Sequence, residues 1–153
     1  MTGAMRQCYG ENNMNAIAHF LVTLVFAKVF NLTEYEFLLA LLFGVLIDLD
    51  HLVKLPLYLK QNGLAVVRYW NWRTSLQEPV SLLWIVPVSL FLQSWVPVFF
   101  FLTHVALDYL MCYEKRPFFP FSDFTIAERK HKIDDVAGVG VSALALLILA
   151  VII

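Results

Sequence analysis

Five apolar segments, separated by more polar stretches of unequal length, constrain this chain more than any other feature of its sequence. A helix needs about 20 residues (range about 17–25) to cross a hydrocarbon core of about 30 Å, and most of these segments approach or reach that length. Their number predicts a single all-α domain over residues 1–153, built as a polytopic membrane helical bundle of about five transmembrane helices. The expected spans are approximately residues 14–30, 35–59, 79–93, 96–112 and 136–153.

The amino-acid composition points in the same direction. Of 153 residues, 60% are hydrophobic and 15% are charged, and the mean hydropathy is +0.71. A soluble domain usually has about 25% charged residues. A chain of this size leaves about a third of its surface exposed, so a core cannot bury all of the apolar surface. The net charge of −1 argues against a nucleic-acid partner, which needs a concentrated basic patch.

The distribution of Lys and Arg predicts an orientation. Basic residues lie in the N-terminal tail and in the loops after the second and fourth segments, whereas the turns at 31–34 and 93–95 have none. With five spans, all basic loops share the side of the N-terminus, which the positive-inside rule makes cytoplasmic. The sequence thus predicts a multi-pass protein of the inner (cytoplasmic) cell membrane, with the lipid bilayer as partner. If the short third segment is re-entrant instead, the orientation of everything after it reverses.

Ionisable side chains inside the apolar segments or directly at their ends are the candidate functional residues, because they are costly in lipid unless paired, hydrated or liganded. Two pairs share a helix face through their spacing, Asp48 with His51 and His104 with Asp108. In a five-span bundle all of these groups would lie at about the same depth. The set consists of His19, Asp48, Asp50, His51, Glu78, His104 and Asp108.

Imidazole together with carboxylate is a ligand set for Zn²⁺, Mn²⁺ or Fe, with zinc favoured here. One or two such divalent transition metals would lower the pKa of bound water and make a nucleophile near neutral pH. Asp50 and Glu78 are candidate catalytic carboxylates, and Arg73 is a candidate for binding an anionic substrate group. The predicted metal ligands are His19, Asp48, Asp50, His51, His104 and Asp108.

Each of these residues also has an interpretation without metal, and these alternatives stay open. They are an interfacial or inter-helix hydrogen bond for His19, a polar network or ion pair with Lys54 for Asp48 and His51, and a self-satisfied pair for His104 and Asp108. For the remaining three they are a helix cap for Asp50, ordinary helix N-terminal charge for Glu78 and a positive-inside residue for Arg73.

The string from Gly44 to His51 contains a D-x-D-H element that resembles the signature of the YdjM-like family of inner-membrane proteins, which are assigned as metal-dependent hydrolases. His19 matches an early-span histidine of that family, and His104 with Asp108 matches a later H-x-x-x-D. An aromatic and proline-rich stretch follows at 117–121. The resemblance covers about residues 16–124, and it implies a helical membrane fold, a divalent metal and hydrolase activity.

Two departures from that pattern affect the expected site. Ile47 stands where the family usually has proline before the first aspartate. The family also has an H-R-x-x-T-H-S element, and here Arg73 matches while Trp72 and Gln77 stand at the two histidine positions. Either Glu78 supplies a substitute oxygen ligand, or the site has lost some of its ligands.

Three functional hypotheses follow. The leading one is a membrane-embedded metal-dependent hydrolase that acts on a lipid or lipid-linked phosphoester at the cytoplasmic leaflet. The second is a catalytically degenerate accessory subunit of a larger membrane complex, with other membrane subunits as partners. The third is a small transporter or proton path that uses the same buried acids. All three use the same cluster of ionisable residues.

Overall fold

Helices make up nearly all of the regular structure that is described for this chain. The computed structural model describes residues 16–63, 74–110, 115–122, 124, 126 and 134–152, without the side chains of 51, 62 and 134–137. An isolated antiparallel bridge between Lys115 and Ile126 is the β pairing found in these residues. The elements are α1 (Ala16–Val29), α2 (Glu34–Gly44), η1 (Leu46–Asp50), α3 (His51–Asn62), η2 (Ser75–Gln77), η3 (Pro79–Ser81), α4 (Leu82–Phe91), α5 (Val96–Leu110) and α6 (Asp134–Ile152), where η denotes a 3₁₀ helix.

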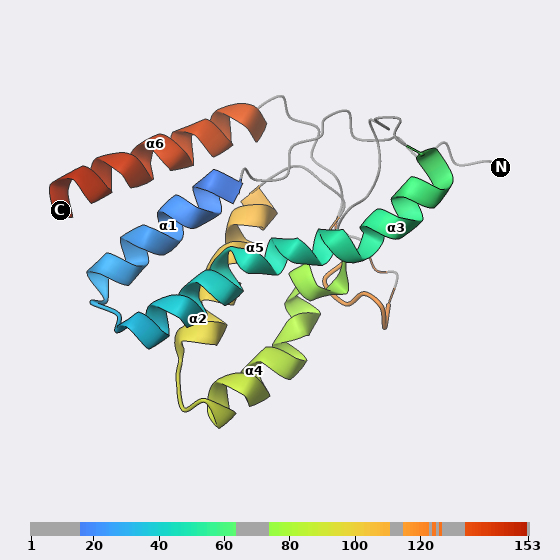
Figure 1. Cartoon of the computed structure of the whole chain (residues 1–153), viewed down its shortest axis with the longest axis horizontal. Coiled ribbons are helices and arrows are strands. Elements are labelled where there is room, and N and C mark those ends of the chain that lie inside the picture. The colour runs from blue at the N-terminus through green and yellow to red at the C-terminus, as the bar shows by residue number, and fades with distance from the viewer. Residues whose placement is uncertain are drawn as a thin grey trace.

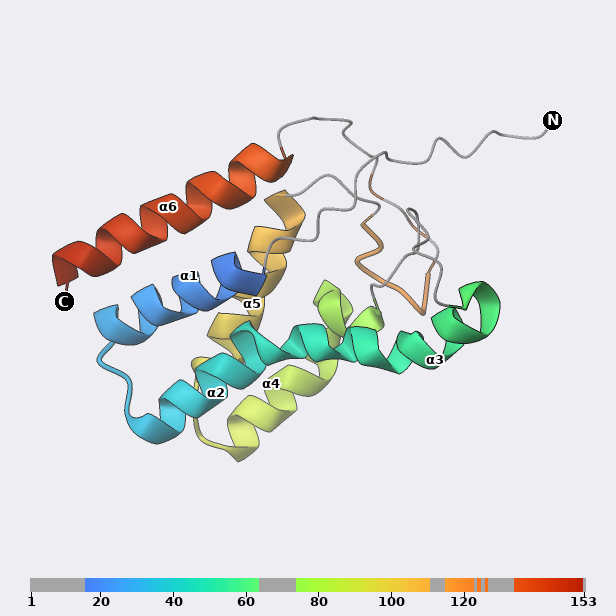
Figure 2. The same cartoon turned by 45° about the horizontal axis from the view of Figure 1, so that its top comes forward.

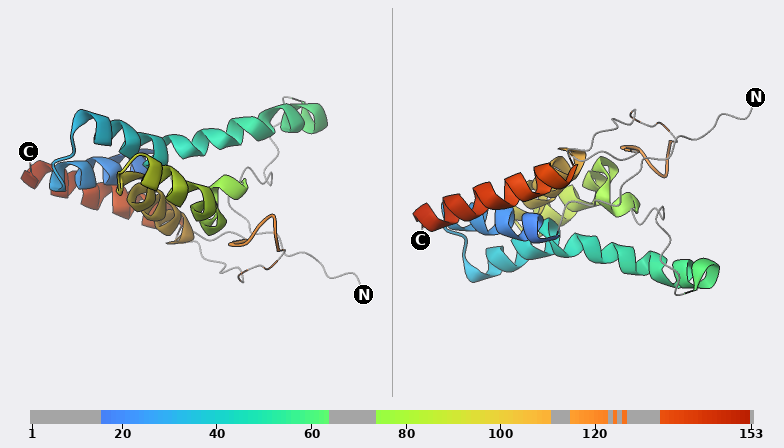
Figure 3. Two further views of the ribbon diagram at one scale, coloured as in Figure 1. Left: turned by 90° about the horizontal axis from the view of Figure 1, so that it is seen from below. Right: turned by 90° about the horizontal axis from the view of Figure 1, so that it is seen from above.

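Helix α5 occupies the middle of the bundle (Figure 1). It contacts α2, α4 and α1, and α6 packs along the other side of α1. Figure 2 shows α6 beside α1, with both helices above α2. Helix α3 extends beyond the other helices, in roughly the direction that α2 takes (Figure 3).

The start and end of α2 both have local causes. Thr33 caps the helix: its side chain accepts a hydrogen bond from Glu36 N, and the Glu36 side chain accepts one from Thr33 N. The Glu36 carboxylate accepts hydrogen bonds from both Thr33 N and the Thr33 hydroxyl, and these two bonds hold the pKa of Glu36 below its ordinary value. The helix ends at Gly44, and the chain continues as the 3₁₀ turn η1 before α3 begins at His51.

The core lies mainly between α2, α4 and α5. Phe100 and Phe101 of α5 are almost fully buried, as is Ile85 of α4. They pack with Phe43 and other apolar residues of α2 in one cluster. A smaller cluster of Val25, Ala145 and Leu149 joins α1 to α6.

The prediction of about five transmembrane helices is wrong. Among the residues that the structure describes, no helix combines the length and the apolar character that a membrane crossing requires. Helices α1 to α5 have between 10 and 15 residues. At about 1.5 Å per residue they are about 15–23 Å long, against a hydrocarbon core of about 30 Å. The all-α class is retained, and the membrane-spanning architecture is not.

The longest predicted span, residues 35–59, shows the physical reason most clearly. It is interrupted after Gly44 by η1, so its apolar residues belong to two short helices instead of one long helix. The multi-pass location in the cell membrane and the cytoplasmic N-terminus were both derived from the span count, and they are wrong with it. The apolar excess is divided between the core and exposed side chains such as Leu90 and Phe91.

Gly44 lies where α2 approaches its neighbours most closely, and this gives a first prediction. A Cβ built there would lie 2.7 Å from Thr23 Oγ1 and 3.4 Å from a ring carbon of Phe100. Thr23 and Phe100 are both buried and have little room to move. We therefore expect Gly44→Ala to lower the free energy of unfolding by about 1–3 kcal/mol through overpacking.

Gly140 in α6 is the matched control, because a Cβ there would meet nothing within 4 Å. Alanine favours a helix interior over glycine by about 1 kcal/mol, so Gly140→Ala should leave stability unchanged or raise it. Urea unfolding of both variants measures the difference. Equal effects of the two substitutions would contradict the close approach at Gly44.

Candidate metal centre

His104 is held in one orientation by the backbone of α2. Its side chain is buried on α5, and Nδ1 lies 3.1 Å from the carbonyl oxygen of Gly44. A carbonyl oxygen only accepts hydrogen bonds, so Nδ1 carries the hydrogen and donates it. In a neutral imidazole, the lone pair is then on Nε2.

Two carboxylates face that Nε2 atom. Asp48 Oδ1 of η1 lies 3.3 Å away, and Asp108 Oδ2, one turn along α5, lies 3.7 Å away. Nε2 itself is buried and makes no hydrogen bond to the described part of the chain. A lone pair that points toward carboxylates is repelled by them unless a proton or a metal cation lies between.

His19 of α1 is oriented in a similar way. Its Nε2 lies 3.2 Å from Asp108 Oδ1, and the side chain is 1% exposed. A carboxylate that is ionised only accepts, so Nε2 carries the hydrogen and Nδ1 carries the lone pair. Nδ1 is the second buried side-chain nitrogen without a hydrogen-bond partner in the described residues. Each histidine therefore has one nitrogen bonded to an acceptor and one nitrogen suited to a ligand.

His19, Asp48 and His104 form a group that could hold a metal ion, since one ligand atom from each lies within 4.8 Å of the other two. Ligands about 2.0–2.1 Å from a tetrahedral zinc lie about 3.3 Å apart, which matches the distance from His104 Nε2 to Asp48 Oδ1. Both imidazoles are buried, whereas the Asp48 side chain is 25% exposed. The group is therefore open to solvent on the side of Asp48.

The two imidazole rings are stacked, with centroids 4.1 Å apart and an angle of 21° between their planes. A metal lies close to the plane of each imidazole that binds it. Binding by both rings therefore requires them to tilt away from this stacked arrangement. His104 is tied to a backbone carbonyl and His19 to a side chain, so His19 has the greater freedom to move.

The charges around His104 shift its titration. Burial is the largest single influence and lowers its pKa, but the nearby Asp48 carboxylate, the charge of Asp108 and the hydrogen bond to the Gly44 carbonyl together outweigh burial. The pKa of His104 in the metal-free protein is therefore raised above its ordinary value. A proton and a metal cation compete for the same Nε2 lone pair.

The other two carboxylates predicted from the sequence lie nearby but outside this group. Asp50 accepts hydrogen bonds from the Thr74 hydroxyl and from Gln77 Nε2. Glu78 accepts one from the Tyr109 hydroxyl at 2.8 Å, and its other oxygen faces Arg116 N at 3.5 Å. Neither belongs to the group of ligand atoms within 4.8 Å of one another.

Two further predicted residues cannot be placed. Arg73 lies outside the described residues, and so does the side chain of His51, whose backbone begins α3. The polar residues that sequence patterns missed are Thr74 and Gln77. Gln77 was seen only as a replacement for a histidine of the resembled family, yet its Nε2 lies 2.8 Å from Asp48 Oδ1.

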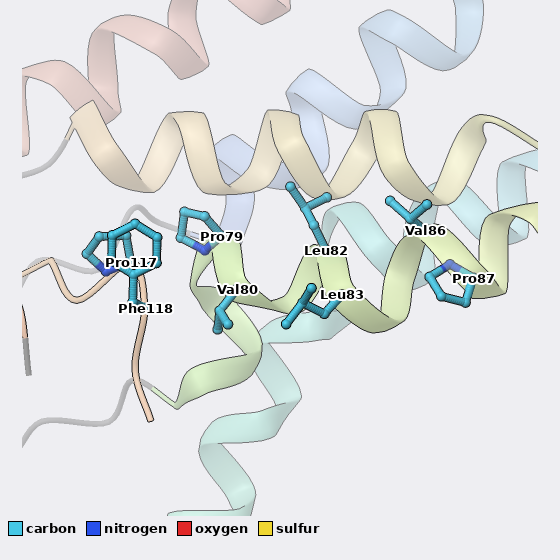
Figure 4. Close-up of a pocket in the computed structure, with 8 residues that line it drawn as sticks. All are labelled: Pro79, Val80, Leu82, Leu83, Val86, Pro87, Pro117 and Phe118. Atoms are coloured by element: carbon cyan, nitrogen blue, oxygen red, sulfur yellow. The ribbon is translucent and has the colours of Figure 1, made fainter. Parts of the chain in front are cut away.

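A separate apolar cavity of about 520 Å³ lies along α4 (Figure 4). It shares no residue with the histidine and aspartate group, and its walls offer no ionisable side chain. Its lining residues are Pro79, Val80, Leu82, Leu83, Val86, Pro87, Pro117 and Phe118.

Comparison of the chain with models of protein families, with curated proteins and with solved structures finds no match. The resemblance to the YdjM-like family therefore stays a prediction from the sequence. The geometry of the described residues alone supports the site.

The raised pKa of His104 predicts that the stability of the protein changes with pH in one direction without metal and in the opposite direction with metal bound. Without metal, the stabilisation from protonated His104 is fully present below the unfolded pKa of about 6.5 and is lost as pH rises through the raised folded pKa. With metal, stability should rise over the same interval because binding requires the unprotonated imidazole.

Thermal unfolding in EDTA and in excess Zn²⁺, measured across this interval, tests the prediction. His104→Gln is the control, since it should remove the contribution of the His104 imidazole to the pH profile of the metal-free protein. Identical pH profiles with and without Zn²⁺ would contradict a metal site at His104.

Proposed function

We propose that this protein is a metal-dependent hydrolase whose divalent transition metal, most suitably Zn²⁺, is held by His19, Asp48 and His104. The observation that carries the proposal is the pair of buried imidazole nitrogens, one on each histidine, that have no hydrogen-bond partner in the described residues while their other nitrogens are bonded. Mixed nitrogen and oxygen donors with an open side are typical of catalytic zinc sites.

Each residue of the proposed site would have a distinct role. His104 and His19 offer nitrogen lone pairs, and Asp48 offers an oxygen on the exposed side, where a substrate can approach. Asp108 bonds to His19 Nε2 and so would fix the tautomer of that ring, with the lone pair on Nδ1. A bound Zn²⁺ would supply Lewis acidity and lower the pKa of a bound water to about 7.

The reaction class proposed is hydrolysis of a phosphoester or carboxylic ester. The expectation of a lipid substrate depended on the depth of the site in a bilayer, and it is not retained because no described helix crosses one. Glu78 is not proposed as the general base, since Tyr109 and Arg116 engage its two oxygens away from the metal ligands.

A structural polar network without metal is the alternative. The raised pKa of His104 favours it, because a protonated imidazole between Asp48 and Asp108 would satisfy both carboxylates. Under this alternative the chain has no hydrolase chemistry of its own. Metal content separates the two candidates.

Elemental analysis of the purified protein should find about one transition-metal ion for each chain, consistent with the one ligand group found among the described residues. His104→Ala and Asp48→Ala should both lose it, because each removes a ligand. Glu78→Gln is the matched control, a buried carboxylate of the same region that lies outside the ligand group, and it should keep the metal. Folded wild-type protein that takes up no metal would refute the proposal.

Activity is tested with 4-nitrophenyl esters of phosphate, of a phosphodiester and of acetate. We expect turnover of at least one of them, loss of turnover after EDTA treatment, and recovery on addition of Zn²⁺. Turnover that persists unchanged in EDTA, or metal-loaded protein that hydrolyses none of the three, would count against the hydrolase assignment.

A further inference from the structure

Gln77 is a buried polar residue whose partners are ionisable residues of the candidate site. It lies at the end of η2, and its side chain is 1% exposed. Its amide nitrogen Nε2 lies 2.8 Å from Asp48 Oδ1 and 3.1 Å from Asp50 Oδ1. An amide nitrogen has two hydrogens, so these two carboxylates can use both of them.

The two carboxylates also determine which way the Gln77 amide faces. If the amide were turned over, its oxygen would meet two carboxylate oxygens with no hydrogen between them, which is unfavourable in a buried site. Asp50 is itself held from the far side by the Thr74 hydroxyl. Thr74 in turn caps η2, since its oxygen accepts a hydrogen bond from Leu76 N at 3.1 Å.

The oxygen of Asp48 that Gln77 contacts is the same atom that faces His104. Asp48 Oδ1 lies 3.3 Å from His104 Nε2 and 2.8 Å from Gln77 Nε2. The Asp48 side chain is the most exposed of the three ligands, and η1 provides its backbone. A hydrogen bond from a buried, fixed donor therefore limits its rotation.

From these contacts we propose that Gln77 is a positioning residue for the Asp48 ligand, and that Asp50 acts through Gln77 and not as a ligand. This inference rests on the proposed metal site at His19, Asp48 and His104. A donor that bonds a ligating carboxylate orients it, and loss of such a donor typically costs about 10–100-fold in metal affinity. Asp50 keeps the donor hydrogens of Gln77 directed at the site.

The test is Zn²⁺ titration of the metal-free protein with a competing chelator. Gln77→Met keeps the length and approximate volume of the side chain and removes both donors, so it should weaken Zn²⁺ binding by about 10–100-fold. Asp50→Asn should weaken binding less than Asp48→Asn does, and it should leave the number of bound ions at one.

Ser81→Ala is the control for a purely structural effect. Ser81 is also buried, and its hydroxyl donates to Ser75 O at 2.8 Å, so its loss disturbs the same 3₁₀ region without touching Asp48. It should lower the melting temperature of the metal-free protein and leave the Zn²⁺ affinity within about twofold of wild type, because the Ser81 hydroxyl bonds to a backbone oxygen and not to Asp48 or Gln77.

A spectroscopic measurement adds a readout that stability alone would not change. In the Co²⁺-substituted protein, Gln77→Met should alter the visible absorption spectrum because the Asp48 oxygen is displaced, whereas Ser81→Ala should not.

Three outcomes would overturn parts of the proposal. This inference alone would be overturned if wild type binds metal normally and Gln77→Met leaves both the Zn²⁺ affinity and the Co²⁺ spectrum unchanged. Loss of bound metal in Asp50→Asn would overturn the role given to Asp50. Wild type that binds no metal would overturn this inference together with the proposed function.

Discussion

The hydrogen bond from His104 Nδ1 to the Gly44 carbonyl joins the two helices on which most of the structure depends. Helices α2 and α5 supply most of the main core cluster, and Gly44 is the residue at which α2 ends. The end of α2 lets η1 turn Asp48 toward α5, and the same carbonyl sets the tautomer of the imidazole that Asp48 faces. The contact between Gly44 and His104 therefore belongs both to the packing of α2 against α5 and to the geometry of the candidate site.

The polar groups at this point are satisfied in a particular way. One nitrogen of each histidine is hydrogen-bonded to an oxygen, which is a backbone carbonyl for His104 and a carboxylate for His19. Asp50 accepts hydrogen bonds from a hydroxyl and from an amide. Buried polar atoms are rarely left without partners, so the two remaining nitrogens mark where the network is incomplete. His104 Nε2 faces the Asp48 carboxylate, and His19 belongs to the same group of residues that could hold a metal ion.

Much of the site could be predicted from the sequence. The spacing of His104 and Asp108 places both on one helix face, and His19 and Asp48 were expected to meet them; the structure brings all four together. Asp50 and Glu78 were included because they are carboxylates in the same segments. Their local partners, Thr74, Gln77 and Tyr109, direct them elsewhere, and no sequence pattern encodes those contacts.

The fold was predicted correctly as helical and wrongly as membrane-spanning. Hydropathy averaged over residues 35–59 does not register the interruption after Gly44, because the residues on both sides are apolar. The close fit of Gly44 against Thr23 and Phe100 is a tertiary contact between three helices. The hydrogen bond that the Gly44 carbonyl accepts from His104 could not be predicted either, because every residue has a backbone carbonyl.

The unequal exposure of the three proposed ligands has a consequence for how fast a bound ion would exchange. Both imidazoles are shielded from water, while Asp48 is partly exposed. An incoming cation would meet the carboxylate first and shed its water on that side before reaching either ring. Departure would follow the reverse order, so the lifetime of the bound ion would depend on the motion of one carboxylate at the surface and not on separation of the helices.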